Sequence, residues 1–229
     1  MRVETYFARG LFCRNAIGIA VALAGLVFTS SARATSAILT ITQTGFPDIN
    51  ILDNGPGDSS PAPGTITWQP SSVSGFNLTF VSAFSNSPGN GVQGQISQTH
   101  FDIRNSSAGP VTLTLTLTDT GFTSPVTSRI LSSDITATLQ SLGANDLVSF
   151  QSSADSTSTA LQTLTATGSS HLAVPFSDTG TYSLKGVTTL TLSPGATAAL
   201  TESTTVTPEP ASMALLSLAG LGLLRRRRA

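Results

Sequence analysis

Alternation of apolar and polar residues is the dominant pattern in the middle of this chain. It is clearest in GPVTLTLTLTDTGF, where Val111, Leu113, Leu115 and Leu117 share one parity and threonines occupy the other. A period of two places these side chains on opposite faces of a β-strand, one apolar and one exposed to water. Threonine suits the exposed face because its β-branched side chain favours a strand without adding charge.

Weaker segments with the same alternation follow one another along the chain. They cover residues 37–43, 65–69, 76–84, 94–104, 129–142, 147–153, 161–168, 171–177, 182–193 and 196–207. The stretches between them are rich in Gly, Pro, Asn and Asp, which favour turns. Many strands without a convincing amphipathic helix predict an all-β fold, an antiparallel β-sandwich of Greek-key or jelly-roll type. We expect residues 151–162 to form a long exposed hairpin or a mobile loop, and residues 202–208 to serve as a short tether.

Charge is scarce in this predicted body. Only 10% of the 229 residues are charged, and most of the basic ones lie near the two ends. The stretch 35–207 has three basic and ten acidic residues, a net charge of −7. A nucleic-acid partner is therefore not expected, because phosphate binding needs clustered Lys and Arg.

The N-terminal segment has the order of a secretory signal peptide. Basic residues precede the apolar stretch 16–28, which is followed by TSSARA. Ala32 and Ala34 supply the small residues that signal peptidase requires, so we predict a helical signal peptide over residues 1–34 with cleavage before Thr35. The single cysteine, Cys13, falls in this segment, and the secreted part would then have no thiol.

The C-terminal segment predicts a second contact with the membrane. The apolar run Ala211–Leu224 would form a helix of roughly 21 Å, shorter than the hydrocarbon core of about 30 Å. Arg225, Arg226, Arg227 and Arg228 would hold the end of this short transmembrane helix on the cytoplasmic side. Just before it, Pro208 and Pro210 favour an extended backbone around Glu209, which gives a processing enzyme a charge to recognise.

This order of features resembles a known sorting signal. Pro208-Glu209-Pro210, a helix rich in Leu, Ala and Gly, and a terminal arginine cluster are similar to the PEP-CTERM signal of Gram-negative bacteria, although Thr207 stands where valine is often found. The resemblance implies recognition by an exosortase, a multi-spanning membrane enzyme that cleaves near the motif and releases or transfers the protein to the cell surface. It divides the chain into a signal peptide (1–34), a secreted β domain (35–206) and a sorting signal (207–229), with transient anchoring in the inner membrane.

Candidate catalytic residues are few. His100 and His171 have no spacing that would pair them, so each is expected at the surface or at a strand end. A Ser-His-Asp triad has no G-x-S-x-G turn to support it. We therefore expect no enzyme activity, no cofactor and no metal.

Two binding alternatives remain open from the sequence. Asp48, Asp53 and Asp58 lie in one loop that offers oxygen ligands for calcium, but their spacing is not that of an EF-hand, and a solvated turn is the preferred interpretation. Trp68, the only tryptophan, could stack on a sugar if exposed, although a lone tryptophan in a strand is more often part of a core.

Three functions follow from these features. The preferred one is a non-catalytic protein of the cell surface or extracellular matrix, associated with exopolysaccharide or biofilm, since the family that the tail resembles accompanies exopolysaccharide production. The second is a carbohydrate-binding module. The third is a secreted hydrolase, which would need a concave site that gathers a histidine and aspartates.

Overall fold

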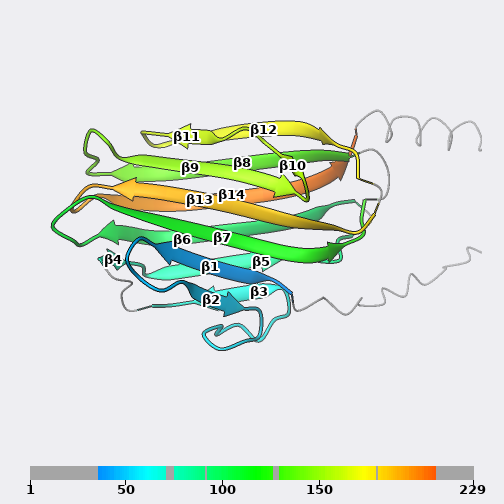
Figure 1. The fold of residues 1–229 in the computed structure, drawn as a ribbon, viewed down its shortest axis with the longest axis horizontal. Helices are drawn as coiled ribbons and strands as arrows, with labels where there is room; N and C mark the ends of the chain where they lie inside the picture. The colour runs from blue at the N-terminus through cyan, green and yellow to red at the C-terminus, as the bar shows by residue number, and fades with distance from the viewer. Residues whose placement is uncertain (1–35, 71–74, 91, 126–128, 179, 210–229) are drawn as a thin grey trace, which may run out of the picture. The chain divides into compact units, whose positions relative to one another are not determined.

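The computed structural model describes residues 36–70, 75–90, 92–125, 129–178 and 180–209 (Figure 1). These ranges contain strands, turns and loops, and no helix among them is long and apolar enough to cross a membrane. The predicted signal-peptide helix (1–34) and the predicted transmembrane helix (211–224) both lie outside the described residues.

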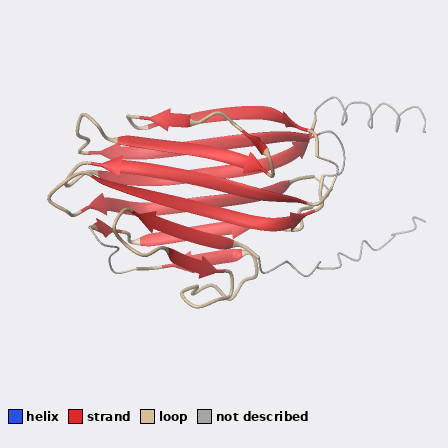
Figure 2. Cartoon of the chain, viewed as in Figure 1, coloured by secondary structure: helices blue, strands red, loops and turns tan. Residues whose placement is uncertain are grey.

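The described residues form two seven-stranded antiparallel sheets (Figure 2). The first sheet has the order β10 (Thr157–Ser158), β9 (Leu147–Ala154), β13 (Tyr182–Leu192), β7 (Val111–Phe122), β1 (Ile38–Gln43) and β2 (Ile49–Leu52), with β11 (Gln162–Leu164) also paired to β9. The second has the order β12 (Gly168–Phe176), β8 (Arg129–Gln140), β14 (Thr197–Pro208), β6 (Gly94–Asn105), β5 (Phe80–Ser85) and β3 (Thr65–Trp68), with β4 (Phe76–Asn77) also paired to β6. The prediction of an all-β fold is confirmed.

The two sheets face each other across a single apolar core, and the connections between them follow a jelly-roll order. From β6 onward the chain crosses from sheet to sheet at almost every connection. The order β6-β14-β8-β12 in one sheet faces β7-β13-β9-β11 in the other, which is the arrangement of two Greek keys in a jelly roll. As a consequence, strands distant in the sequence lie side by side, such as β6 and β14 (Figure 1).

Alternation along each strand builds the core. Leu113, Leu115 and Leu117 of β7 are fully buried, as the period of two predicts. The threonines of the other parity lie on the outer face of the first sheet, where Thr112 pairs its hydroxyl with Thr191 of β13 at 2.9 Å. The outer face of β7 and β13 thus carries mainly neutral hydroxyl groups, beside the exposed Lys185 of β13.

One short strand, β2, was not expected from the sequence, and another, β10, forms the hairpin that was one of two alternatives. β2 lies in the aspartate-containing loop, and β10 lies in the stretch expected to be a hairpin or mobile loop. That stretch is a hairpin of β9 and β10, but one side of it is packed inside, because Ser152 and Thr159 are buried while Asp155 is exposed.

The expectation that residues 202–208 form a tether is wrong. They belong to β14, which pairs with β8 on one side and β6 on the other. Val206 is fully buried because it shares the inward parity of Leu200 and Glu202. The sandwich therefore extends to the first proline of the sorting signal.

Candidate functional site

The sorting motif begins inside the second sheet. Pro208 is the last residue of β14 and is level with Arg129 of β8, while Glu209 follows directly and is partly exposed. Pro210 lies outside the described residues, as do Ala32, Ala34 and Arg225 to Arg228. The motif therefore begins on β14 itself, a strand in the interior of the second sheet, with no linker among the described residues.

An aromatic cluster packs this end of the sandwich. Arg129 is 1% exposed, and its guanidinium carbon lies 4.7 Å from the ring centre of Tyr182 and 5.5 Å from that of Phe176. Burial raises the pKa of the Tyr182 hydroxyl, which donates a hydrogen bond to the carbonyl of Ser124. Within the described residues, Nε and Nη1 of Arg129 have no hydrogen-bond partner, so the guanidinium is held mainly by the two rings.

His100 lies in the core, which contradicts the expectation of a surface or strand-end histidine. It is completely buried on β6, and its Nε2 is 3.6 Å from Oε2 of the buried Glu202. Burial lowers the pKa of His100 to about 3 and raises that of Glu202 to about 8, although a hydrogen bond from Thr188 to Oε1 at 3.0 Å partly opposes the second shift. Both groups are therefore neutral over most of the acidic and neutral range, and neither contacts solvent as a catalytic base must.

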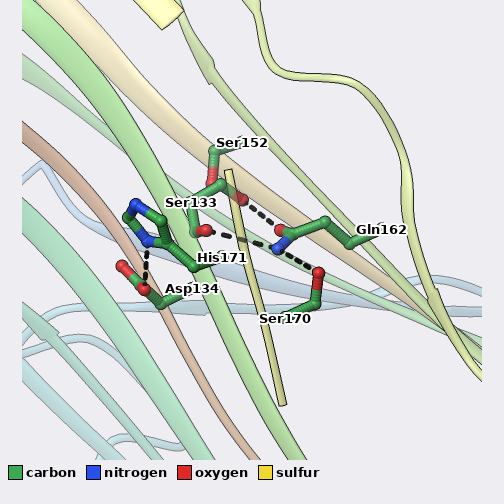
Figure 3. A network of polar contacts seen from close by, with 6 residues as sticks. All are labelled: Ser133, Asp134, Ser152, Gln162, Ser170 and His171. Carbon is green, nitrogen blue, oxygen red and sulfur yellow. Dashed lines mark hydrogen bonds and ion pairs between the residues drawn. The ribbon is translucent and has the colours of Figure 1, made fainter. Parts of the chain in front are cut away.

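A second polar cluster ties the two sheets together near one edge (Figure 3). Its hydrogen bonds run from Thr204 to Ser152 (2.7 Å), from Ser152 to Ser133 (2.8 Å), from Ser133 to Gln162 (2.7 Å) and from Gln162 to Ser170 (3.0 Å). Ser133, Ser152 and Gln162 are at most 3% exposed. Each polar group has a partner, so this cluster stabilises the packing of the sheets.

His171 lies on the outer face, as expected. Its Nδ1 is 2.6 Å from Oδ1 of Asp134 on the neighbouring strand, and the two side chains are 61% and 49% exposed. Asp134 follows Ser133 in β8, so the exposed pair and the buried cluster occupy opposite faces of the same strand (Figure 3). An ion pair this exposed contributes little to stability.

The loop aspartates bind backbone groups. Asp53 accepts hydrogen bonds from the amide of Gly64 (2.7 Å) and the side chain of Asn54 (3.1 Å). Asp58 accepts from three backbone amides, those of residues 54, 60 and 67. Asp48 is exposed. Within the described ranges, no group of three or more His, Cys, Asp and Glu could hold a metal ion.

Trp68 lies at the end of β3, partly buried and packed against the core. This position agrees with the expectation that a lone tryptophan in a strand packs against the core. The buried polar residues His100, Gln98 and Glu202 were not recognised from the sequence, although each shares the inward parity of an apolar neighbour on its strand.

Comparisons with known proteins agree with the analysis of the tail and add little about the body. No curated protein matches the chain. Among solved structures, it is similar to the carbohydrate-binding module TmCBM61 in complex with beta-1,4-galactotriose, with a TM-score of 0.32 and 9% identity over 67% of this chain and 92% of that one. It is also similar to a CBM4 structure (TM-score 0.26, 13% identity, 67% and 93% covered) and to a structure of infectious bursal disease virus, Gx strain (0.21, 12%, 77% and 55%). Similarity at this level carries no information about function.

The family comparison concerns the C-terminal segment. Residues 206–228 match the model of the PEP-CTERM protein-sorting motif, which begins two residues before the end of β14. Such a motif implies export, sorting to the cell surface and processing by an exosortase at the membrane. The chain thus carries a PEP-CTERM protein-sorting motif at residues 206–228.

Proposed function

We propose that this chain is a non-catalytic protein of the cell surface or extracellular matrix. In this proposal the β-sandwich is the mature, exported domain and the tail is a sorting signal that is removed by cleavage. The observation that carries the proposal is the sorting motif at residues 206–228, joined directly to the end of a central strand. Signal peptidase would cut before Thr35, and the apolar run 211–224 would anchor the chain transiently in the inner membrane. An exosortase-type enzyme would then remove the tail.

The position of β14 limits where that enzyme can cut. Val206 is fully buried and paired with both Leu131 and Gly94. Loss of a buried valine costs roughly 1.5–3 kcal/mol in burial of apolar surface alone. Thr207 and Pro208 are still paired with Ile130 and Arg129 of β8. A cut that leaves the whole strand intact therefore falls after Pro208, and we expect the mature C-terminus there.

Three features of the sandwich support a non-catalytic role. His100 is sealed in the core and held neutral by burial. His171 contacts an exposed aspartate on the outer face of a sheet. The loop carboxylates Asp53 and Asp58 are occupied by hydrogen bonds to the chain itself. His100, Asp53 and Asp58 thus act in folding.

The outer surface supports association with a hydrated polymer such as exopolysaccharide in a biofilm. The exposed face of the first sheet carries paired threonines, Thr112 with Thr191 and Thr114 with Thr189. Neutral hydroxyl groups form hydrogen bonds with a polyhydroxylated polymer without the salt dependence of charged contacts.

Mass spectrometry of the extracellular protein tests this function. In cells that contain the exosortase, we expect an N-terminus at Thr35 and a C-terminus after Pro208; in cells without it, the chain should keep its arginine tail. Glu209→Gln should also retain the tail, because it removes the charge that the enzyme recognises. Asp134→Asn removes an exposed carboxylate of the sandwich and should be processed normally. Identical C-termini with the arginines attached in both strains would refute the proposal.

A further inference from the structure

We propose that a pocket at the end of the sandwich remote from Pro208 binds a neutral sugar unit. The pocket has a volume of about 700 Å³, within the roughly 300–1,000 Å³ of small-molecule sites. Its lining includes Gln43, Phe46, Gly75, Ser107, Pro110 and Thr112. The inference deepens the proposed function, because it supplies a way for the delivered sandwich to hold a polysaccharide.

Hydrogen bonds of the surrounding loops fix the walls of the pocket. The buried Asn105 donates to the carbonyls of Gly109 and Leu192 and accepts from both the amide and the hydroxyl of Ser107. Ser106 binds the carbonyl of Gly75 through its amide at 2.8 Å and its hydroxyl at 3.1 Å. The β6–β7 loop is thus joined to the opposite wall, and little ordering is required when a ligand enters.

Gly75 keeps the space between these walls open. Its φ of +96° is one that other residues rarely adopt. A Cβ there would lie 3.4 Å from Cβ of Ser107 and 3.9 Å from Nε2 of Gln43. A side chain at this position would therefore occupy the gap between the two walls.

The chemistry of the lining selects a neutral polyol. None of the lining residues carries a charge, and Gln43 contributes a side-chain amide. The hydroxyls of Ser107 and Thr112 are bonded to Asn105 and Thr191, but each oxygen keeps a lone pair that can accept a hydrogen bond from a ligand. Phe46 is 48% exposed, so its ring is accessible to a ligand in the pocket. A pyranose ring matches both features, because its hydroxyls form hydrogen bonds with the polar groups while its C–H face packs on an aromatic ring. A phosphate or uronate would find no cation among these residues.

The location of the pocket suits a tethered protein. Asn105 ends β6 beside Ala196, directly before β14 begins, whereas Pro208 ends β14 at the other end of the sandwich (Figure 1). Strand β14 has 12 residues, which span about 40 Å at roughly 3.3 Å per residue. A chain held by its tail would therefore present the pocket on the side away from the anchor.

Sugar binding by the full-length chain, purified in a zwitterionic detergent without a sugar headgroup, tests this site. Calorimetry and saturation-transfer NMR would use cellotriose, maltotriose and mannotriose as neutral probes and trigalacturonate as a charged one. At least one neutral probe should bind and trigalacturonate should not. Phe46→Ala should weaken binding about tenfold, in line with the value of one aromatic contact. Thr112→Val, a second pocket variant, should weaken it about fivefold because a hydrogen-bonding group is lost.

The matched control is Leu52→Ala. Leu52 is 46% exposed on β2, close to the exposure of Phe46, but it does not line the pocket. Its replacement should leave binding unchanged. The site is refuted if no neutral probe binds, if Phe46→Ala and Thr112→Val bind as the parent does, if Leu52→Ala weakens binding equally, or if trigalacturonate binds as well. Because the full-length chain is used, failure of sugar binding is distinct from failure of export or tail removal.

Discussion

Replacement of Glu202 by glutamine, followed across pH, tests our account of the buried His100–Glu202 pair. Burial holds the pKa of Glu202 at about 8 and that of His100 at about 3, so both side chains are neutral between these values. Glutamine has nearly the same shape as the neutral acid. Its Oε1 can still accept the hydrogen bond from Thr188, and its NH2 group would face Nε2 of His100. The variant therefore removes the titration and keeps the packing.

The expected pH dependence follows from the two shifts. The pKa of Glu202 rises from 4.5 to about 8 on folding, so its contribution is complete below pH 4.5 and is lost as pH rises to 8, by about 1.4 kcal/mol per pH unit. The pKa of His100 falls from 6.5 to about 3, so its contribution is complete above pH 6.5 and is lost as pH falls to 3. Between pH 4.5 and 6.5 the two slopes cancel. The wild type should lose about 2 kcal/mol from pH 6.5 to 8, and a similar amount from pH 4.5 to 3.

Urea unfolding monitored by circular dichroism at a series of pH values measures this profile. Glu202→Gln should show no loss between pH 6.5 and 8, and its free energy of unfolding relative to the wild type should rise by about 5 kcal/mol from pH 4.5 to 8. Asp102→Asn removes an exposed carboxylate of β6 and controls for the loss of one charge. A charged His100–Glu202 pair would hold the same number of protons and give the wild type the same profile, so the variant distinguishes the two states: a Glu202→Gln protein that is strongly destabilised at pH 6 would mean that the pair is charged and that our reasoning is wrong. A wild type that stays flat to pH 8 would contradict the raised pKa of Glu202.

Three further predictions concern packing and surface contacts. Gly94→Ala should cost roughly 1–3 kcal/mol or prevent folding, because its Cβ would lie 2.3 Å from the hydroxyl of Tyr182. Gly109→Ala is the control and should change the free energy of unfolding little, because no atom lies within 4 Å of its Cβ. Thermal unfolding compares the two variants. Ser152→Ala should cost about 1–3 kcal/mol in urea unfolding, since it leaves two buried hydroxyls without a shared partner. His171→Ala should change the unfolding free energy by less than about 1 kcal/mol, because the ion pair that it removes is exposed; a larger loss in urea unfolding would contradict this.

The long strands could be predicted from the sequence because their side chains alternate over many residues. In β7 and β13 the apolar parity is almost unbroken, and both strands appear close to the expected bounds. β2 and β10 have four and two residues. Segments this short are held by their neighbours in the sheet and carry no usable period. The sequence therefore predicts a loop at β2, and at β10 it leaves a hairpin and a mobile loop both open.

The polar interior was missed for a different reason. Composition favours placing a histidine at the surface, but Gln98 and His100 follow the inward parity of Ile96 on β6, and this parity decided their position. Val206 also lies in the alternating segment 196–207, and it is the strand assignment, not the tether, that the structure confirms. The pocket could not be foreseen, because it depends on which distant loops the jelly-roll connections bring to one end of the sandwich.

The central place of β14 also has a consequence for the order of folding. This strand is the last in the chain among the described strands, yet it fills the gap between β6 and β8. Before residues 197–208 have crossed the membrane, β6 and β8 lack the strand that joins them. The core-facing side of the second sheet is then incomplete. Because translocation proceeds from the N-terminus, the domain would cross as an open chain and close only when its final strand has emerged. Completion of the fold and arrival of the sorting signal at the bilayer would then be a single event.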